Sequence, residues 1–298
     1  MVRSLEGEPA MIAWSEKKTF YAAISPCPND SYIFGAWVLG MAGDVNPLRT
    51  RFVWEDVQTL NQEAGSGTWD LIKVSAVQAL RLEHDWSILS CGGAFGLGHG
   101  PKLVVSKKNK KVPFKIAVPG MLTTAYALLA ACVNFDFEAV PMPFDRIPAA
   151  VADRQVDAGL LIHETALIHD QLGLDMFLDL GSWWQKESGG LPLPLGVIII
   201  KKCLGENIRF QTEDIIRRSI SMARENMPGI RPLIMHLARE LDEEVINKHI
   251  LTYVNEYSLD VGEKGKRALS FLRKISLSGT TRDCPKKPDP FHSEFSTT

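Results

Sequence analysis

Short apolar segments that resemble β-strands alternate with segments of helical pattern along this chain. The first three strand-like segments are Thr19–Ile24, Arg51–Trp54 and Asp70–Val74, and helical patterns begin between them at Ser31 and Asp56. A strand followed by a helix and a further strand is typical of the units that build parallel sheets. The alternation therefore predicts an α/β fold with a mainly parallel sheet.

A second unit of the same kind follows. Its strand-like segments are Phe114–Val118, Ala139–Met142 and Asp157–Ile162, and the helical segment Ala125–Val133 lies between the first two. After the apolar run Val197–Ile200 the pattern is mostly helical. Ligands of such sheets bind beyond the carboxyl ends of the strands, so we expect two lobes with a ligand cleft between them.

The same pattern divides the chain into segments. We expect a flexible N-terminal extension over residues 1–17 and a first α/β lobe over residues 18–108. Residues 109–202 are predicted to form the second lobe, and the helical residues 203–278 to return and complete the first. Residues 279–298, with Gly279, Thr280, Thr281, Pro285, Lys286, Lys287 and Pro288, are predicted to form a disordered tail.

Charge and hydropathy exclude several classes of partner. The chain has 33 Lys and Arg against 35 Asp and Glu, a net charge of −2 with no basic run interleaved with aromatic residues, which argues against nucleic acid. The longest apolar stretch, Leu191–Ile200, is interrupted by two prolines and falls far short of the roughly 20 residues of a membrane span. We expect neither a nucleic-acid nor a membrane partner, and a homodimer is compatible with the sequence.

The N-terminus and the cysteines indicate the compartment. Residues 1–8 lack the apolar segment of a secretory signal. The five cysteines are widely spaced and odd in number, unlike a disulfide framework. Both features favour a reducing, cytoplasmic location.

One pair of residues resembles the start of a zinc motif. His163 and Glu164 begin like H-E-x-x-H, but Leu167 occupies the position of the second histidine. His169 lies six residues after His163, about 240° round a helix, and would face away. No cysteine pair has C-x-x-C spacing. We therefore predict no metal site.

Polar residues follow several of the predicted strands. Ser25 and Asn29 follow the first strand, Ser75 the third, and His163 the last strand of the second unit. Carboxyl ends of strands meet at one edge of a sheet, so these side chains are expected in the cleft. A neutral imidazole suits a general base, although a lone histidine is often structural. Ser75 lacks the glycine pattern of a nucleophile elbow and is assigned a hydrogen bond to ligand. Ser25 and Asn29 either bind ligand or stabilise the turn after the first strand by hydrogen bonds, with the second role slightly favoured.

Two threonines open a helix directly after a predicted strand. Thr123 and Thr124 follow the strand Phe114–Val118 and a Pro-Gly turn. Their hydroxyls and the free N–H groups of the first helical turn favour a carboxylate or phosphate. Ordinary N-capping explains the same residues equally well.

Ten short strings together resemble one family, the 1,4-dihydroxy-6-naphthoate synthases of the futalosine route to menaquinone. They occur in the order of that family over about residues 19–275. Each string is weak by itself, and the combination is specific. The strings are Ser25–Asp30 (SPCPND), Glu55–Asn61 (EDVQTLN), Lys73–Ser75 (KVS), Gly92–Gly96 (GGAFG), Val118–Gly120 (VPG), Thr123–Tyr126 (TTAY), Ile162–Glu164 (IHE), Asp179–Trp184 (DLGSWW), Leu191–Gly196 (LPLPLG) and Tyr253–Gly262 (YVNEYSLDVG).

The resemblance implies a fold, a reaction and a set of site residues. The fold would be the two-lobed periplasmic-binding-protein-like fold of type 2, with no metal or organic cofactor. The reaction would be a lyase step in which cyclic dehypoxanthine futalosine loses its sugar-derived carbons as a triose and leaves 1,4-dihydroxy-6-naphthoate. His163 falls on the proposed base of the family. Ser75 and Thr124 fall on its ligand contacts, with Thr123 beside them, so the expected partner is a small-molecule carboxylate.

Three other functions share this fold class. A solute-binding receptor would bind a small carboxylate without turnover, and the missing export signal argues against it. Chorismate dehydratase, a related enzyme of the same route, would share the lobes, but the Ser25–Asp30 and Ile162–Glu164 strings favour the naphthoate synthase. A ligand-sensing domain would need a DNA-binding helix pair or a basic face, and the sequence indicates neither.

Overall fold

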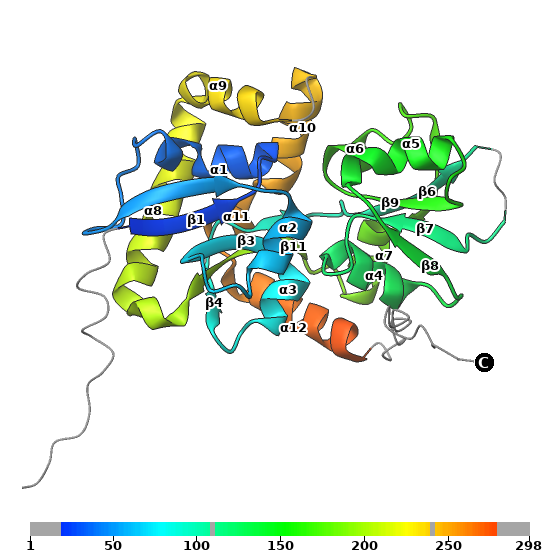
Figure 1. Ribbon diagram of the computed structural model, residues 1–298, viewed down its shortest axis with the longest axis horizontal. Coiled ribbons are helices and arrows are strands. Elements are labelled where there is room, and N and C mark those ends of the chain that lie inside the picture. Colours follow the sequence, from blue (N-terminus) through cyan, green and yellow to red (C-terminus); the bar gives the residue numbers. More distant parts are fainter. Residues whose placement is uncertain (1–18, 108–110, 239–241, 279–298) are drawn as a thin grey trace, which may run out of the picture.

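The computed structural model describes residues 19–107, 111–238 and 242–278, which form two α/β lobes side by side (Figure 1). Each lobe is built around its own sheet, with strand order β2-β1-β3-β11-β4 in the first and β10-β6-β9-β7-β8 in the second. The predicted segments 1–17 and 279–298 lie outside the described residues. Within the described residues no helix is both long and apolar enough to cross a membrane.

The first sheet begins as predicted, with three parallel strands. They are β1 (Thr19–Ile24), β2 (Arg49–Trp54) and β3 (Leu71–Ser75), with β1 between the other two. The connecting helices are α1 (Pro28–Val38) and α2 (Val57–Glu63). The helix α1 starts early because Pro28 at its first position needs no hydrogen-bond partner.

The rest of the first sheet is antiparallel, so the prediction of a mainly parallel sheet is wrong. The long strand β11 (Leu193–Lys201) pairs antiparallel with β3, β4 (Trp86–Ile88) and β5 (Ala94–Gly96). It arrives from the other lobe rather than through a crossover helix, and nothing forces it to run parallel. The short helix α3 (Ala76–Arg81) follows β3.

The second sheet is also mixed. Its parallel part is β7 (Lys115–Val118), β8 (Glu138–Pro141) and β9 (Ala158–Leu161). Antiparallel to β9 runs β6 (Lys102–Ser106), which pairs in turn with β10 (Leu174–Asp179). The helices of this lobe are α4 (Thr124–Cys132), the 3-10 turn η2 (Phe144–Arg146), α5 (Ile147–Ala152), α6 (His163–Leu167) and α7 (Leu180–Glu187).

The C-terminal helices return to the first lobe. There α1 packs against α8, α9 and α10, while α12 packs on α3 and β11 and also reaches α4 (Figure 1). Apolar residues of α1, α8 and α9, among them Phe34, Ile216 and Ile230, bury one face of the sheet. These elements are the 3-10 turn η3 (Lys202–Leu204), α8 (Gly205–Glu225), α9 (Met227–Leu237), α10 (Glu243–Tyr253), α11 (Glu256–Leu259) and α12 (Gly262–Ser278).

The chain crosses between the two lobes at different places from those predicted. The strand β6 lies in the predicted first lobe (18–108) but pairs in the second sheet, and β11 lies in the predicted second lobe (109–202) but pairs in the first. The crossings therefore run over residues 97–101 and 188–192.

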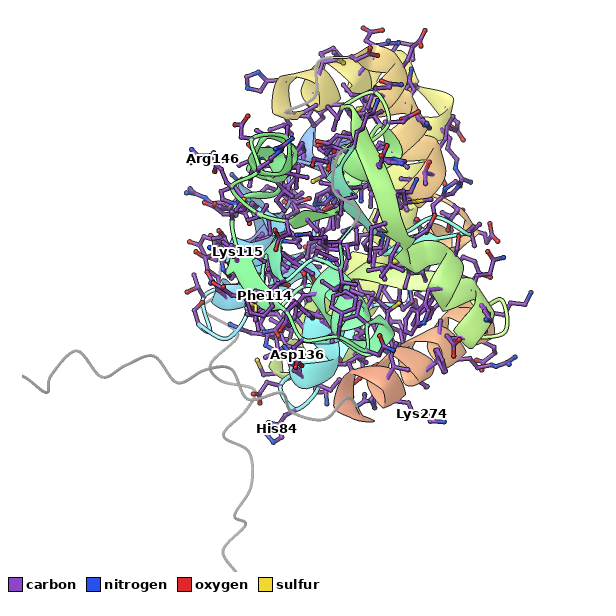
Figure 2. The ribbon with its side chains drawn as sticks, turned by 90° about the vertical axis from the view of Figure 1, so that its right-hand side faces the viewer. His84, Phe114, Lys115, Asp136, Arg146 and Lys274 are labelled. Carbon is purple, nitrogen blue, oxygen red and sulfur yellow. The ribbon has the colours of Figure 1, made fainter. Side chains whose placement is uncertain are left out.

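Glycines allow the first crossing to pack closely against the second lobe. A Cβ atom on Gly100 would lie 2.8 Å from the Cα atom of Gly181, and one on Gly181 would lie 2.6 Å from the backbone N of Gly100. Both positions therefore exclude larger residues. The outer face of the second lobe exposes Lys115, Asp136 and Arg146 together with the apolar side chain of Phe114 (Figure 2).

Candidate functional site

A pocket between the lobes contains all six predicted site residues. It encloses about 680 Å³, counting the space open to solvent. Both sheets contribute, because the carboxyl ends of β1, β3, β7 and β9 approach each other there. The lining residues include Ser25, Asn29, Ser75, Thr123, Thr124 and His163, together with Asp30, Lys73, Gly196, His249 and Tyr253.

His163 is placed at the pocket by the end of β9 and the start of α6. Its backbone has φ +54°, a left-handed conformation that costs energy in a residue with a Cβ atom. The ring is half-buried and meets the ring of Phe144 edge to face, with 4.8 Å between the ring centroids. Its Nδ1 atom lies 3.6 Å from Sγ of Cys27. Burial lowers the pKa of His163 to about 4, with Glu164 opposing that shift. The imidazole is therefore neutral near pH 7 and can accept a proton.

The two threonines use their hydroxyls within the protein. Thr123 caps α4, because its Oγ1 accepts from the N–H of Tyr126 at 3.2 Å and donates to the carbonyl of Gly120 at 2.7 Å. Thr124 donates to the carbonyl of Leu195 at 2.9 Å. The N–H groups of Thr124 and Ala125, at the first two positions of α4, have no intrahelical acceptor. The groups at this end of the pocket that can donate a hydrogen bond to an anion are therefore backbone N–H groups rather than hydroxyls.

Ser75 is held by a residue that the sequence analysis did not single out. The amide of Asn61 on α2 donates to Oγ of Ser75 at 3.0 Å, and the N–H of Ser75 donates back to Oδ1 of Asn61 at 2.8 Å. Oγ of Ser75 acts as the acceptor in the first bond, so its own O–H hydrogen is free to point into the pocket. Ser75 therefore suits a hydrogen bond to a ligand oxygen.

Ser25 and Asn29 both bind Asp30. Oγ of Ser25 donates to one carboxylate oxygen of Asp30 at 2.6 Å, and Nδ2 of Asn29 donates to the other at 2.9 Å. The turn role favoured for both residues is thus present, and both also line the pocket.

A buried ion pair joins Asp30 of α1 to Lys73 of β3. Side chains alternate along β3, so Ile72 and Val74 enter one core and Lys73 faces the other side of the sheet, toward α1. Gly196 of β11 makes room for it, because a Cβ atom there would lie 2.8 Å from Cε of Lys73. A lysine within the apolar string Leu71–Val74 was the sequence signal for this pair.

Glu164 and His249 form a second buried charged contact beside His163. Nδ1 of His249 lies 3.3 Å from Oε2 of Glu164, and the two side chains are 1% and 8% exposed. Burial opposes the charge on Glu164, but the nearby imidazoles outweigh burial and lower its pKa to about 2. His249 lies 86 positions after His163, so no local motif could have linked them.

His163, Glu164 and His249 are also the residues that could hold a metal ion, since one donor atom from each lies within 4.8 Å of the others. Imidazole and carboxylate donors of this kind suit zinc or iron. The carboxylate of Glu164 already lies 3.3 Å from Nδ1 of His249. We therefore assign these two side chains to each other rather than to a metal ion.

Comparison with solved structures defines the class of fold. A protein from Archaeoglobus fulgidus superposes with a TM-score of 0.82 at 36% identity, covering 87% of this chain and 97% of that chain. A Candida albicans gene product, described as having the generic periplasmic binding protein structural fold, superposes with a TM-score of 0.64 at 12% identity, covering 88% and 94%. The predicted periplasmic-binding-protein-like α/β fold is therefore confirmed.

Sequence relatives then define the family. A family model described as menaquinone biosynthesis matches residues 21–276. The 1,4-dihydroxy-6-naphthoate synthase of Thermus thermophilus is 41% identical over 83% of this chain and 90% of its own length. That of Streptomyces coelicolor is 36% identical over 85% and 91%. The chain belongs to the menaquinone biosynthesis family and is one of its enzymes.

Proposed function

We propose that the protein is a carbon–carbon lyase that converts cyclic dehypoxanthine futalosine to 1,4-dihydroxy-6-naphthoate and a triose. The two synthases that it resembles at 41% and 36% identity support the naphthoate product. The observation that carries the proposal is His163, a neutral imidazole at the end of β9 that faces the pocket.

The reaction starts with one proton transfer. His163 removes a proton from a sugar-derived hydroxyl or from a carbon beside the ketone of the substrate. A retro-aldol fragmentation follows, in which the carbon–carbon bond to the sugar-derived carbons breaks and its electron pair moves toward the ketone. Those carbons leave as a triose, and the remaining ring gains a double bond and becomes aromatic. No electrons are gained or lost overall, so the reaction needs no redox cofactor.

The rest of the pocket orients the substrate. Its ring carboxylate lies at the start of α4, where the N–H groups of Thr124 and Ala125 and the helix dipole favour an anion. The O–H of Ser75 donates to a second oxygen of the substrate. Lys73 lines the same pocket and is balanced by Asp30, so it adds little net charge.

The position of the base accounts for a large share of the rate. A well-placed general base contributes about 10²–10⁴-fold. Closure of the lobes around the substrate excludes water from the intermediate. Aromatisation supplies the driving force, so the protein needs only to hold the substrate and move protons. We further propose that the enzyme acts in the cytoplasm.

The direct test is turnover by the purified protein. Cyclic dehypoxanthine futalosine is added with no cofactor, and the naphthoate is followed by absorbance and the triose by mass spectrometry. We expect both products in equal amounts. Tight binding of the substrate with neither product formed would contradict the proposal and indicate a solute-binding receptor instead.

A further inference from the structure

The contact between Glu164 and His249 joins the two lobes. Glu164 belongs to α6 of the second lobe, and His249 to α10, which packs on α1 of the first lobe. Figure 1 shows α10 at the edge of the first lobe that faces α6. Both side chains are buried, so the contact is shielded from water and salt.

The two ring nitrogens of His249 face different groups. Nδ2 of Asn29 donates to the carboxylate of Asp30, which fixes Oδ1 of Asn29 as an acceptor. That oxygen lies 3.0 Å from Nε2 of His249, so Nε2 donates to it. Nδ1 lies 3.3 Å from Oε2 of Glu164, whose pKa of about 2 keeps it ionised, although the two atoms are not aligned as a hydrogen bond. His249 thus bonds to α1 through one nitrogen and makes a close polar contact with the carboxylate of α6 through the other.

A second contact ties the same two helices. Lys248, next to His249 on α10, donates through Nζ to the carbonyl of Leu167 at 3.3 Å. Leu167 is the last residue of α6, where a cation satisfies free carbonyls and the helix dipole. Adjacent residues of α10 therefore hold both ends of this five-residue helix.

The first residue of α6 is His163. Its left-handed backbone costs energy and persists only where the surroundings hold it. The ring of His249 lies nearly parallel to that of His163, at an angle of 13° with centroids 6.0 Å apart. The clamp on α6 and this ring contact together fix the direction of the His163 imidazole.

We propose that Glu164 and His249 are positioning residues, a clamp between the lobes that holds His163 toward the substrate. This inference rests on the proposed function for its effect on rate, since His163 is the base there. Neither residue needs to touch substrate to act. A displacement of the base by about 1 Å is enough to cost on the order of 10²-fold in rate.

Paired substitutions test the clamp through turnover. Glu164→Gln and His249→Gln each remove one partner of the contact and retain most of the volume, and Glu244→Gln, on the exposed side of α10, is the matched control. We expect each clamp variant to lower kcat by about 10²-fold with KM changed little, and the control to behave as wild type. The double variant should be no slower than the slower single variant, because both remove the same contact. Additive losses, or losses confined to KM, would overturn the clamp.

Hydrogen exchange tests the clamp without any substrate. Backbone amides of residues 163–168 should exchange faster in both clamp variants than in wild type or Glu244→Gln, and by a larger factor than the amides of α8, because loss of a buried contact also lowers the overall stability. Equal exchange would overturn the clamp. Faster exchange in a protein that does not turn over cyclic dehypoxanthine futalosine would instead count against the proposed function alone. Turnover that is lost with a chelator and restored by Zn²⁺ would also overturn the clamp, by assigning its residues to a metal.

Discussion

Thr124 of the second lobe donates its hydroxyl hydrogen to the carbonyl of Leu195, 2.9 Å away on a strand of the first sheet. The same oxygen accepts from the N–H of Val77 at 3.2 Å. One side chain thus joins three elements around the pocket and places the start of α4 opposite β11. Thr124 shapes the anion site through these bonds, while its backbone N–H faces the pocket.

Thr124 variants should separate this role from simple loss of volume. Thr124→Ala removes two hydrogen bonds worth about 0.5–1.5 kcal/mol each, so we expect weaker substrate binding and a higher KM with a smaller change in kcat. Thr124→Ser keeps the hydroxyl and should retain a KM near that of wild type. Steady-state kinetics of both variants provide the check, and an unchanged KM in Thr124→Ala would contradict the carboxylate assignment.

The pH dependence of kcat/KM should reflect the environment of His163. The base must be neutral, and burial lowers its pKa from 6.5 to about 4. Activity should therefore persist through pH 6.5 and fall as the pH drops through about 4. An acid limb centred near 6.5 would show that the ring is solvated in the free enzyme.

Stability over the same range is the necessary control. Between pH 6.5 and 4 the unfolded chain binds a proton at this histidine and the folded protein does not, so acidification favours unfolding. The lowered pKa of Glu164 acts in the same direction below pH 4.5, since its ion pair is lost as the pH falls toward 2. Circular dichroism at each pH separates unfolding from loss of the base.

The ion pair of Lys73 with Asp30 should dominate the stability of the pocket. Lys73→Met leaves a buried carboxylate without its cation, and we expect a loss of about 3–5 kcal/mol in the free energy of unfolding. Adding Asp30→Asn removes the orphaned charge, so the double variant should be more stable than Lys73→Met. Urea unfolding of the three proteins measures this, and a double variant less stable than Lys73→Met would contradict the pairing.

Cysteine reactivity should follow burial. Burial raises the pKa of Cys27 strongly and that of Cys91 to about 12, so both remain thiols at pH 7.5. Cys203 is exposed. Among the cysteines of the described residues, we expect iodoacetamide to label Cys203 first, with Cys27 and Cys91 labelled only after unfolding, as peptide mass spectrometry will show. Early labelling of Cys27 would mean that the thiol beside His163 is activated.

The sequence predicts the local elements of the pocket well, because each depends on neighbouring residues. The strand Thr19–Ile24 has the predicted limits. The six site residues, all placed at strand or helix ends, line one pocket. Their roles stay predictions until the variants are measured.

The sequence does not show which distant segments pair with one another. Nothing near Leu193–Lys201 shows that this strand returns to the first sheet and runs antiparallel to β3. The partners of His249 lie 220 and 85 positions away, at Asn29 and Glu164, and meet only through the packing of α10 on both lobes. In the sequence Asn61 resembles any other helical residue, and only the structure shows that it lies beside Ser75.

The central claim is that His163 is the base. His163→Asn removes the base with little loss of volume, and His236→Asn, at an exposed histidine, is the matched control. The decisive measurement is the initial rate of naphthoate formation from cyclic dehypoxanthine futalosine by wild type and both variants. We predict a fall of about 10²–10⁴-fold for His163→Asn, with an unchanged melting curve and full activity in the control. A His163→Asn protein that forms naphthoate at the wild-type rate would contradict the account.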